Sequence, residues 1–405
     1  NTLHPELELD SRDRIESCAI RQSAADAPPT RRDHRIAGGI FQIDGERLQR
    51  RMRVETDITG ERTMIPELAG QPRPDLVLLN EGDLTFAKIR LDEDSRTTMV
   101  EHIDRIDDEL TRSLLWGAAW DLCRDGELPV VDYVSMVLRG IAAETDQTAV
   151  SRALGQAQTA TTLFLAPRHR GPYQAKLIAG LAGLLRDAEP GSDHQLAFAR
   201  ALASAIHTPA GAALLQGWLD DQEVPQGLQI DQDLRWHMII QLARVGAIDD
   251  GGISSELERD NTLTGAEQAA GARAAQPTAA AKARAWHRAT ADPTIPNETH
   301  RQICLQFAHP GQEEQLQLFA SPYFELAERI SAKAGVWAHH GVHLAQSALR
   351  YLFPTVVVDQ EYIRILDEWL VEAPLQDSVR RIIAEARDDA QRSLRVRQRN
   401  RGLRR

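Results

Sequence analysis

Three histidines stand close together in the stretch His339-His340-Gly341-Val342-His343. On a helix, the first and last of them would lie one turn apart, a spacing that can bind zinc. Zinc hydrolases of this type place a catalytic glutamate directly after the first histidine, but none of the 13 histidines in this sequence is followed by glutamate. Gly341 also weakens a helix here, and no third ligand is suggested. We therefore interpret the histidines as polar residues at a helix start without metal. A metal-dependent hydrolase built on them is the alternative.

Four residues near this cluster and beyond it are candidates for contact with a substrate. They are Trp337, His340, Arg380 and Arg381. An indole can stack on a ligand, although aromatic side chains more often pack in cores, which is the alternative for Trp337. The two arginines follow a break at 372–374 and begin the last long helical segment. Arginine binds carboxylates through two parallel hydrogen bonds, and the alternative for this pair is ordinary surface charge.

The elements that position these residues are predicted to be helices. From residue 95 onward apolar residues recur at intervals of three and four, and the breaks between segments are short. The predicted helices include 130–143, 149–165, 173–185, 234–245, 342–352 and 375–394. Such a series without strands is typical of antiparallel helix pairs in a curved, superhelical stack of the HEAT or armadillo kind. We expect a binding site on the concave face of this stack.

Residues 1–94 are predicted to form a small β-sandwich. Apolar and polar residues alternate in the strand candidates 15–20, 36–43 and 48–58. Turn signals accompany them at Gly38-Gly39 and Asp44-Gly45. The fold class is therefore mainly α, with an N-terminal sandwich at 1–94 and a helical domain at 95–405.

The segment from Pro74 to Ser95 joins the two predicted domains. A short apolar run at 75–79 is followed by the turn residues Asn80-Glu81-Gly82-Asp83, and alternation resumes at 84–91. This pattern predicts a closing β-hairpin. Asp94-Ser95 is the predicted N-cap of the first long helix.

This segment, PDLVLLNEGDLTFAKIRLDEDS, also carries a family resemblance, together with the downstream strings WGAAWD at 116–121 and RDGE at 124–127. In these strings the chain resembles the second half of proteins of the aminopeptidase N family, which are zinc peptidases of the gluzincin type. The resemblance extends from Thr2 to Arg397. In that family a zinc catalytic domain precedes a small β-sandwich and a large helical domain, so the resemblance implies that this chain holds the latter two.

The resemblance implies a function in peptide cleavage. In the family, the zinc domain removes N-terminal residues, while the helical domain covers the active site and can hold the far end of a peptide. That far end carries a carboxylate, which Arg380 and Arg381 would bind. The family's HExxH and Gly-x-Met-Glu-Asn motifs are absent from this sequence, so zinc is expected in the catalytic domain and not in this chain. A stand-alone helical-repeat scaffold that binds protein partners is the alternative.

Composition excludes several other classes of function. A net charge of -12 disfavours binding to nucleic acid or to an anionic membrane. No apolar run approaches the roughly 20 residues that span a bilayer. The three cysteines are far apart, which indicates a reducing compartment and hence a cytoplasmic location. The glycosylation pattern Asn297-Glu298-Thr299 is interpreted as a chance match.

Overall fold

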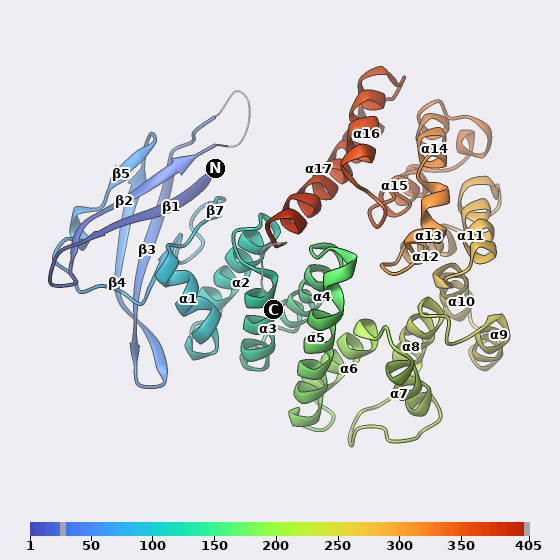
Figure 1. Ribbon diagram of the computed structural model, residues 1–405, viewed down its shortest axis with the longest axis horizontal. Helices are drawn as coiled ribbons and strands as arrows, with labels where there is room; N and C mark the ends of the chain where they lie inside the picture. The colour runs from blue at the N-terminus through green and yellow to red at the C-terminus, as the bar shows by residue number, and fades with distance from the viewer. Residues whose placement is uncertain (25–29, 401–405) are drawn as a thin grey trace. The chain divides into compact units, whose positions relative to one another are not determined.

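The computed structural model describes residues 1–24 and 30–400 of the chain (Figure 1). These residues form two compact units, Asn1–Ala160 and Thr161–Arg405. We call them the N-terminal unit and the helical unit. The mainly α fold with a small N-terminal β part is confirmed, whereas the predicted domain boundary at residue 94 stays a prediction.

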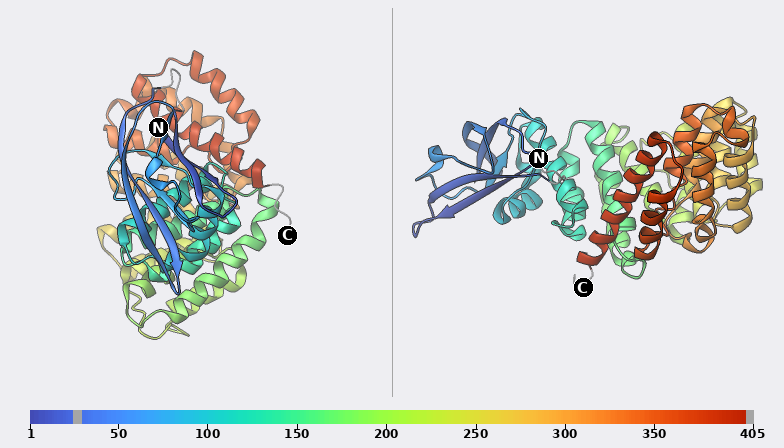
Figure 2. Two further views of the ribbon diagram at one scale, coloured as in Figure 1. Left: turned by 90° about the vertical axis from the view of Figure 1, so that its left-hand side faces the viewer. Right: turned by 90° about the horizontal axis from the view of Figure 1, so that it is seen from above.

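The strands of the N-terminal unit form two sheets, which Figures 1 and 2 show as two layers. The strands are β1 (Thr2–Leu9), β2 (Ile15–Ser23), β3 (His34–Asp44), β4 (Arg47–Ile58), β5 (Arg62–Met64), β6 (Leu76–Leu79) and β7 (Lys88–Ile89). One sheet has the order β5-β2-β1-β7 and the other has the order β4-β3-β6. A single apolar core contains Leu3 and Ile20 from the first sheet and Ile36, Val54 and Val77 from the second. The alternating pattern therefore produces a sandwich, because each strand buries one face between the sheets.

Two predictions about turns in this unit are wrong. Gly38-Gly39 lies within β3 rather than in a turn. A Cβ atom at Gly39 would lie 2.7 Å from the Phe41 ring, so glycine is required there for close packing.

The predicted hairpin at 75–91 also does not form. β6 pairs antiparallel with β3, whereas β7 pairs parallel with β1 in the other sheet. The residues between β6 and β7 cross from one sheet to the other. They do so with positive φ angles at Asn80, Gly82 and Asp83.

The helices of the N-terminal unit begin one residue after Asp92. Its side chain accepts a hydrogen bond from the Ser95 backbone N–H at 3.0 Å, so Asp92 is the N-cap in place of the predicted Asp94-Ser95. The helices are α1 (Glu93–His102), α2 (Glu109–Arg124), α3 (Val130–Gly140) and α4 (Gln147–Leu163), which runs across the boundary between the units. Short 3₁₀ helices are η1 (Pro66–Leu68), η2 (Ile103–Arg105) and η3 (Ile141–Ala143).

The helical unit continues this series without strands in its described residues. Its helices are α5 (Pro167–Asp187), α6 (Asp193–Ala205), α7 (Pro209–Leu219), α8 (Gln232–Arg244), α9 (Asp250–Arg259), α10 (Leu263–Ala275), α11 (Ala279–Ala291), α12 (Asn297–Phe307), α13 (Glu313–Leu316), α14 (Pro322–Ser331), α15 (Val342–Tyr351), α16 (Gln360–Glu372) and α17 (Asp377–Arg399). Two further 3₁₀ helices are η4 (Gln317–Phe319) and η5 (Gly335–Ala338). The predicted break at 167–172 is instead the first part of α5, which tolerates Pro172 near its start.

Helices of the helical unit pack in two layers. In one layer α6 contacts α8, α8 contacts α10, α10 contacts α12, α12 contacts α15, and α15 contacts α17. The alternate helices α7, α9 and α11 each pack against a member of this layer, and Figure 1 shows α9, α11 and α14 on the outer side.

A buried lysine joins the ends of two helices in the first layer. The Lys282 side chain is fully buried, and its Nζ donates to the carbonyls of Ala274 at 2.7 Å and Phe307 at 2.6 Å. These carbonyls belong to the last turns of α10 and α12, where backbone acceptors lack partners within the helix. Lys282 thus satisfies both helix ends at once.

Gln312 and Arg244 join the ends of α6, α8 and α10 in the same way. The Gln312 side-chain amide donates to the carbonyls of Arg244 and Ala275, both at 2.8 Å, and so connects α8 with α10. The Arg244 guanidinium donates to the Ser204 carbonyl at 3.1 Å, at the end of α6. We call Lys282, Gln312 and Arg244 the helix-end junction.

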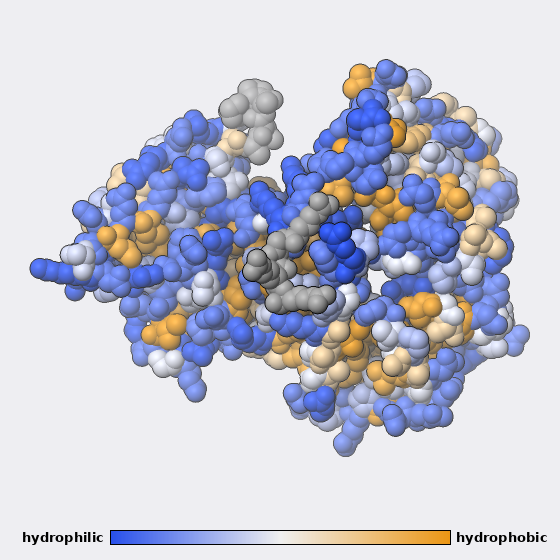
Figure 3. All heavy atoms as spheres, in the orientation of Figure 1, coloured by the Kyte–Doolittle hydropathy of each residue, from blue (hydrophilic) through white to orange (hydrophobic). Residues whose placement is uncertain are grey.

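Surface and cysteine chemistry agree with a well-packed chain. All three cysteines, Cys18, Cys123 and Cys304, are free and buried. The face shown in Figure 3 is predominantly hydrophilic. Among the described helices, none combines the length and the apolar character that crossing a membrane requires.

Candidate ligand-binding groove

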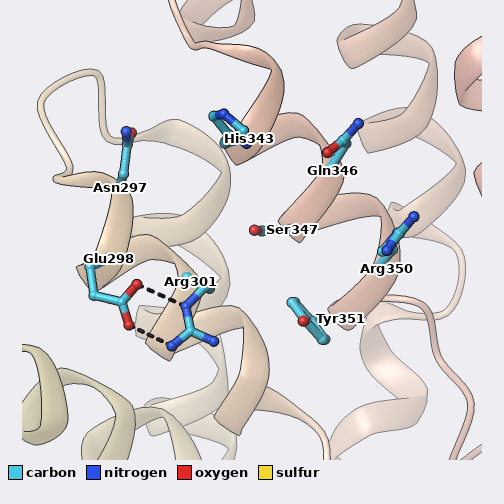
Figure 4. A pocket seen from close by; sticks show the side chains of 8 residues that line it. All are labelled: Asn297, Glu298, Arg301, His343, Gln346, Ser347, Arg350 and Tyr351. Atoms are coloured by element: carbon cyan, nitrogen blue, oxygen red, sulfur yellow. Dashed lines mark hydrogen bonds and ion pairs between the residues drawn. The ribbon is translucent and has the colours of Figure 1, made fainter.

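An open groove of about 350 Å³ lies between α12 and α15 in the helical unit (Figure 4). Its lining consists of polar and charged side chains from these two helices. They are Asn297, Glu298, Arg301, His343, Gln346, Ser347, Arg350 and Tyr351. We call this the α12–α15 groove.

Helical spacing explains why these side chains share one surface. On α15, His343, Ser347 and Tyr351 follow one another at intervals of four, as do Gln346 and Arg350. The opposite side of this helix buries an apolar stripe that includes Leu344, Ala348 and Leu349. On α12 the open side carries Asn297 and Arg301, while residues such as Ile303 and Phe307 face the core. The core stripes hold the two helices together, and the polar sides border the groove.

The charges on the α12 side of the groove are already paired. Arg301 donates from Nε to Glu298 Oε2 at 2.8 Å and from Nη2 to Glu298 Oε1 at 2.6 Å. Hydrogen bonding from Arg301 lowers the pKa of Glu298, and the same contact raises the pKa of Arg301. Both side chains are more than 40% exposed, so the pair contributes little to stability. It does occupy two of the guanidinium nitrogens of Arg301, Nε and Nη2.

The α15 side supplies the groups that can bind a ligand. Arg350 is exposed, and Gln346 and Ser347 carry side-chain donors on the same helix. Tyr351 adds an aromatic ring with a hydroxyl group. Arginine next to amide and hydroxyl donors is suited to carboxylates and to peptide carbonyls. The groove is therefore a candidate site for recognition of an extended, partly anionic ligand such as a peptide.

Two of the predicted site residues contact each other away from this groove. Trp337 in η5 is 3% exposed, and its ring packs edge-on against His340 at 5.2 Å between centroids. The half-buried His340 ring has Nε2 3.1 Å from the Asp292 carbonyl, to which it donates. Trp337 and His340 therefore pack against each other and against neighbouring residues. A role of either residue in substrate binding stays a prediction.

The predicted arginines lie on α17 and do not line the groove. Arg380 donates to the Ala373 carbonyl at 2.9 Å and so satisfies the end of α16. The Arg381 side chain is 76% exposed and has Glu385 3.8 Å away on the same helix. Their binding of a carboxylate stays a prediction.

The zinc spacing of the histidine cluster is not realised on one helix. His339 follows the end of η5, whereas His343 belongs to α15, and Gly341 stands between them as the N-cap of α15. The two histidines are therefore not one helical turn apart. In residues 1–24 and 30–400, no three histidine, cysteine or acidic side chains are grouped as metal ligands would be.

We expect the purified chain to contain no stoichiometric zinc, because the helix break separates His339 from His343. Elemental analysis after dialysis against trace zinc measures this. Stoichiometric zinc that disappears in a His339→Ala, His343→Ala variant would contradict the interpretation.

The sequence did not reveal Arg301, Gln346, Arg350 or Tyr351 as site residues. The available signal was the spacing of polar residues at intervals of four in 342–352, but any solvated helix face shows that spacing. The sequence indicates His343 only as a possible metal ligand, which is a different role. Recognising the groove requires knowing that α12 and α15 are neighbours.

Residues 76–392 match the family model described as "ERAP1-like C-terminal domain". The chain therefore belongs to the family of ERAP1-like C-terminal domains, and this match covers most of its length.

A curated relative agrees with this assignment. The chain is 40% identical over 403 residues to a protein named Aminopeptidase N from Streptomyces lividans. The alignment covers 98% of this chain and 46% of the relative, so the chain spans about half the relative's length. The resemblance to the C-terminal part of an aminopeptidase N, inferred from short strings, is confirmed.

Proposed function

We propose that this chain is the non-catalytic C-terminal region of a zinc aminopeptidase that removes N-terminal residues from peptides. One observation carries the proposal: nearly the whole chain matches an aminopeptidase N, yet these 405 residues lack the HExxH motif. The zinc, the activating glutamate and the cleavage step belong to a catalytic domain outside this sequence. The helical unit covers the active site of that domain and admits short or unfolded peptides. A cytoplasmic location is part of the proposal.

The α12–α15 groove supports a role in holding the peptide away from the bond that is cleaved. Binding energy from such a remote contact helps catalysis by positioning the substrate. Arg350 is exposed in the groove, whereas the guanidinium of Arg301 is paired with Glu298. We therefore propose that Arg350 binds the carboxylate at the far end of a peptide, with Arg380 and Arg381 as the second candidate pair.

The chain alone is expected to fold and to show no aminopeptidase activity, because the motifs for zinc and for the substrate amino group are absent. The measurement is release of product from an aminoacyl chromogenic amide. Far-ultraviolet circular dichroism provides the control that the chain is folded. Product release that a chelator abolishes would disprove the proposal.

In the full-length enzyme, Arg350→Ala is expected to raise KM for peptides of several residues by roughly tenfold, since hydrogen bonds to charged groups contribute about 1.5–3 kcal/mol. A one-residue chromogenic amide should be unaffected, because it does not reach the helical unit. Peptides amidated at the C-terminus lack the carboxylate, so their KM should already be high with the parent enzyme. The substitution should not raise it further.

The matched comparison is the double variant Arg380→Ala, Arg381→Ala measured on the same three substrates. A rise in KM for long peptides in this variant alone would assign the carboxylate to α17 and remove Arg350 from the site. Equal effects on the amide and on the peptides would argue against remote binding by either set of arginines.

A further inference from the structure

We propose that the loop carrying Phe86, together with the groove beside it in the N-terminal unit, is the surface on which the rest of the longer aminopeptidase chain docks. The starting observation is that the Phe86 ring is fully exposed. Leu84, two residues earlier, is also 47% exposed. An aromatic ring on the surface is the type of anchor that protein interfaces bury at their centre.

The loop holds Phe86 in place through specific hydrogen bonds. The Asn80 side-chain amide donates to the Thr85 carbonyl at 2.8 Å, and its oxygen accepts from the Thr85 backbone N–H at 3.1 Å. The Thr85 hydroxyl lies 2.8 Å from His34 Nδ1 on β3. The exposed ring therefore projects from a fixed backbone and is not the tip of a loose loop.

A buried carboxylate connects the start of the loop to the sheet with the order β4-β3-β6. Glu81 is 4% exposed, and it accepts hydrogen bonds from Arg50 and Arg53 on β4, the latter at 2.7 Å. These contacts fix the loop to the sandwich on one side, while Asn80 and Thr85 fix its other side. A loop with this many internal bonds can present a ring to a partner without a large loss of conformational entropy.

A groove of about 330 Å³ is lined in part by residues of the same loop. The loop contributes Ala87 to the lining, and α2 contributes Trp120. Gly117 on α2 has no side chain, and Ala149 and Ala153 on α4 have small ones, so room is left between these helices. A loop that carries an exposed aromatic ring and also lines a groove with Trp120 in its wall offers an anchor and a pocket for the partner's side chains.

Charged groups border this hollow. Asp83, Asp121 and Arg152 belong to its lining, and they come from the loop, α2 and α4 respectively. Docking surfaces between proteins combine apolar and charged side chains in this way. The surface lies entirely within the N-terminal unit.

The occupant that fits best is the remainder of the longer chain. The matched relative continues for more than half of its length outside the region that this chain covers. A chain of that kind carries a further mass of protein beside its C-terminal region. This part of the inference rests on the proposed function, because the remainder is there taken to be the catalytic domain.

Thiol labelling of Phe86→Cys tests the proposal. The native cysteines are all buried, so a thiol at position 86 is the reactive one in a folded protein. The labelling rate is measured in the 405-residue chain and in the full-length enzyme, with Glu46→Cys on the exposed turn between β3 and β4 as the matched control. We expect labelling at position 86 to be at least about tenfold slower in the full-length enzyme, and labelling at position 46 to be unchanged.

Two outcomes would overturn the docking surface. One is equal labelling of position 86 in both proteins. The other is slow labelling in the 405-residue chain alone that speeds up on dilution, which would assign the surface to a second copy. An aminopeptidase assay on the same full-length protein separates the two proposals. Protection of position 86 in an inactive protein would support docking and reject the proposed function, while activity without protection would do the reverse.

Discussion

Lys282→Ala is expected to lower the free energy of unfolding of the helical unit by about 3–5 kcal/mol. The substitution removes the donor that satisfies the Ala274 and Phe307 carbonyls, and it leaves a cavity where a fully buried side chain lay. Both losses act on α10 and α12, in the middle of the contacting layer. Urea denaturation followed by circular dichroism measures the change.

Lys282→Met is the matched control, because methionine keeps most of the volume and removes only the donors. We expect it to lose about 2 kcal/mol or more, since each unsatisfied buried carbonyl costs about 1–3 kcal/mol. Stability equal to that of the parent would show that the two hydrogen bonds contribute nothing net.

The pH dependence provides a second measurement on the same lysine. Burial lowers the pKa of Lys282 from 10.5 to about 7. Between these values the unfolded chain binds more protons, so stability should rise as the pH increases from about 7 towards 10.5. The methionine variant should lack this contribution.

Acidification from pH 6.5 to pH 4 is expected to destabilise the helical unit, with His300 contributing on the order of 3 kcal/mol. His300 is fully buried on α12, and its Nε2 lies 3.0 Å from the Ala289 carbonyl. Burial lowers the pKa of His300 from 6.5 to about 4. The unfolded chain takes up the proton first as the pH falls, so the stability is present above pH 6.5 and is lost on the way to pH 4.

His300→Gln tests this expectation, because glutamine can donate to the Ala289 carbonyl and does not titrate. The variant should lose less stability between pH 6.5 and 4 than the parent does. His343→Gln is the control on the exposed start of α15, and its pH dependence should equal that of the parent. An unchanged pH dependence in His300→Gln would contradict the assignment.

The sequence predicted the kinds of elements better than the pairings between them. Apolar residues at intervals of three and four indicate helices because each helix buries one stripe locally. Asn80 and Gly82 correctly indicated a turn. They did not indicate that β7 pairs with β1, because parallel pairing joins segments that are distant in sequence. The exact helix start was also ambiguous, since Asp92, Asp94 and Ser95 are all good capping residues.

The α12–α15 groove could not be predicted from the sequence for a related reason. Arg301 and Arg350 come from helices that are far apart in sequence, and each is an ordinary solvated arginine when considered alone. His339 and His343 are the opposite case, because they are close in sequence but separated by the helix break at Gly341. The chemistry of each side chain can be predicted from the sequence. Which side chains meet at one site depends on which helices pack together.

The crossing of the chain between the two sheets has a consequence for fragments of this protein. The family match begins at residue 76, the first residue of β6, and so it excludes the strands β1 to β5. The four residues of β6 are all buried and pair with β3, while β7 pairs with β1. A fragment cut at residue 76 would expose an unpaired run of four large apolar residues, which is a nucleus for intermolecular strand pairing. The start of the family match is therefore the wrong place to divide the polypeptide, and soluble expression should require the strands that precede it.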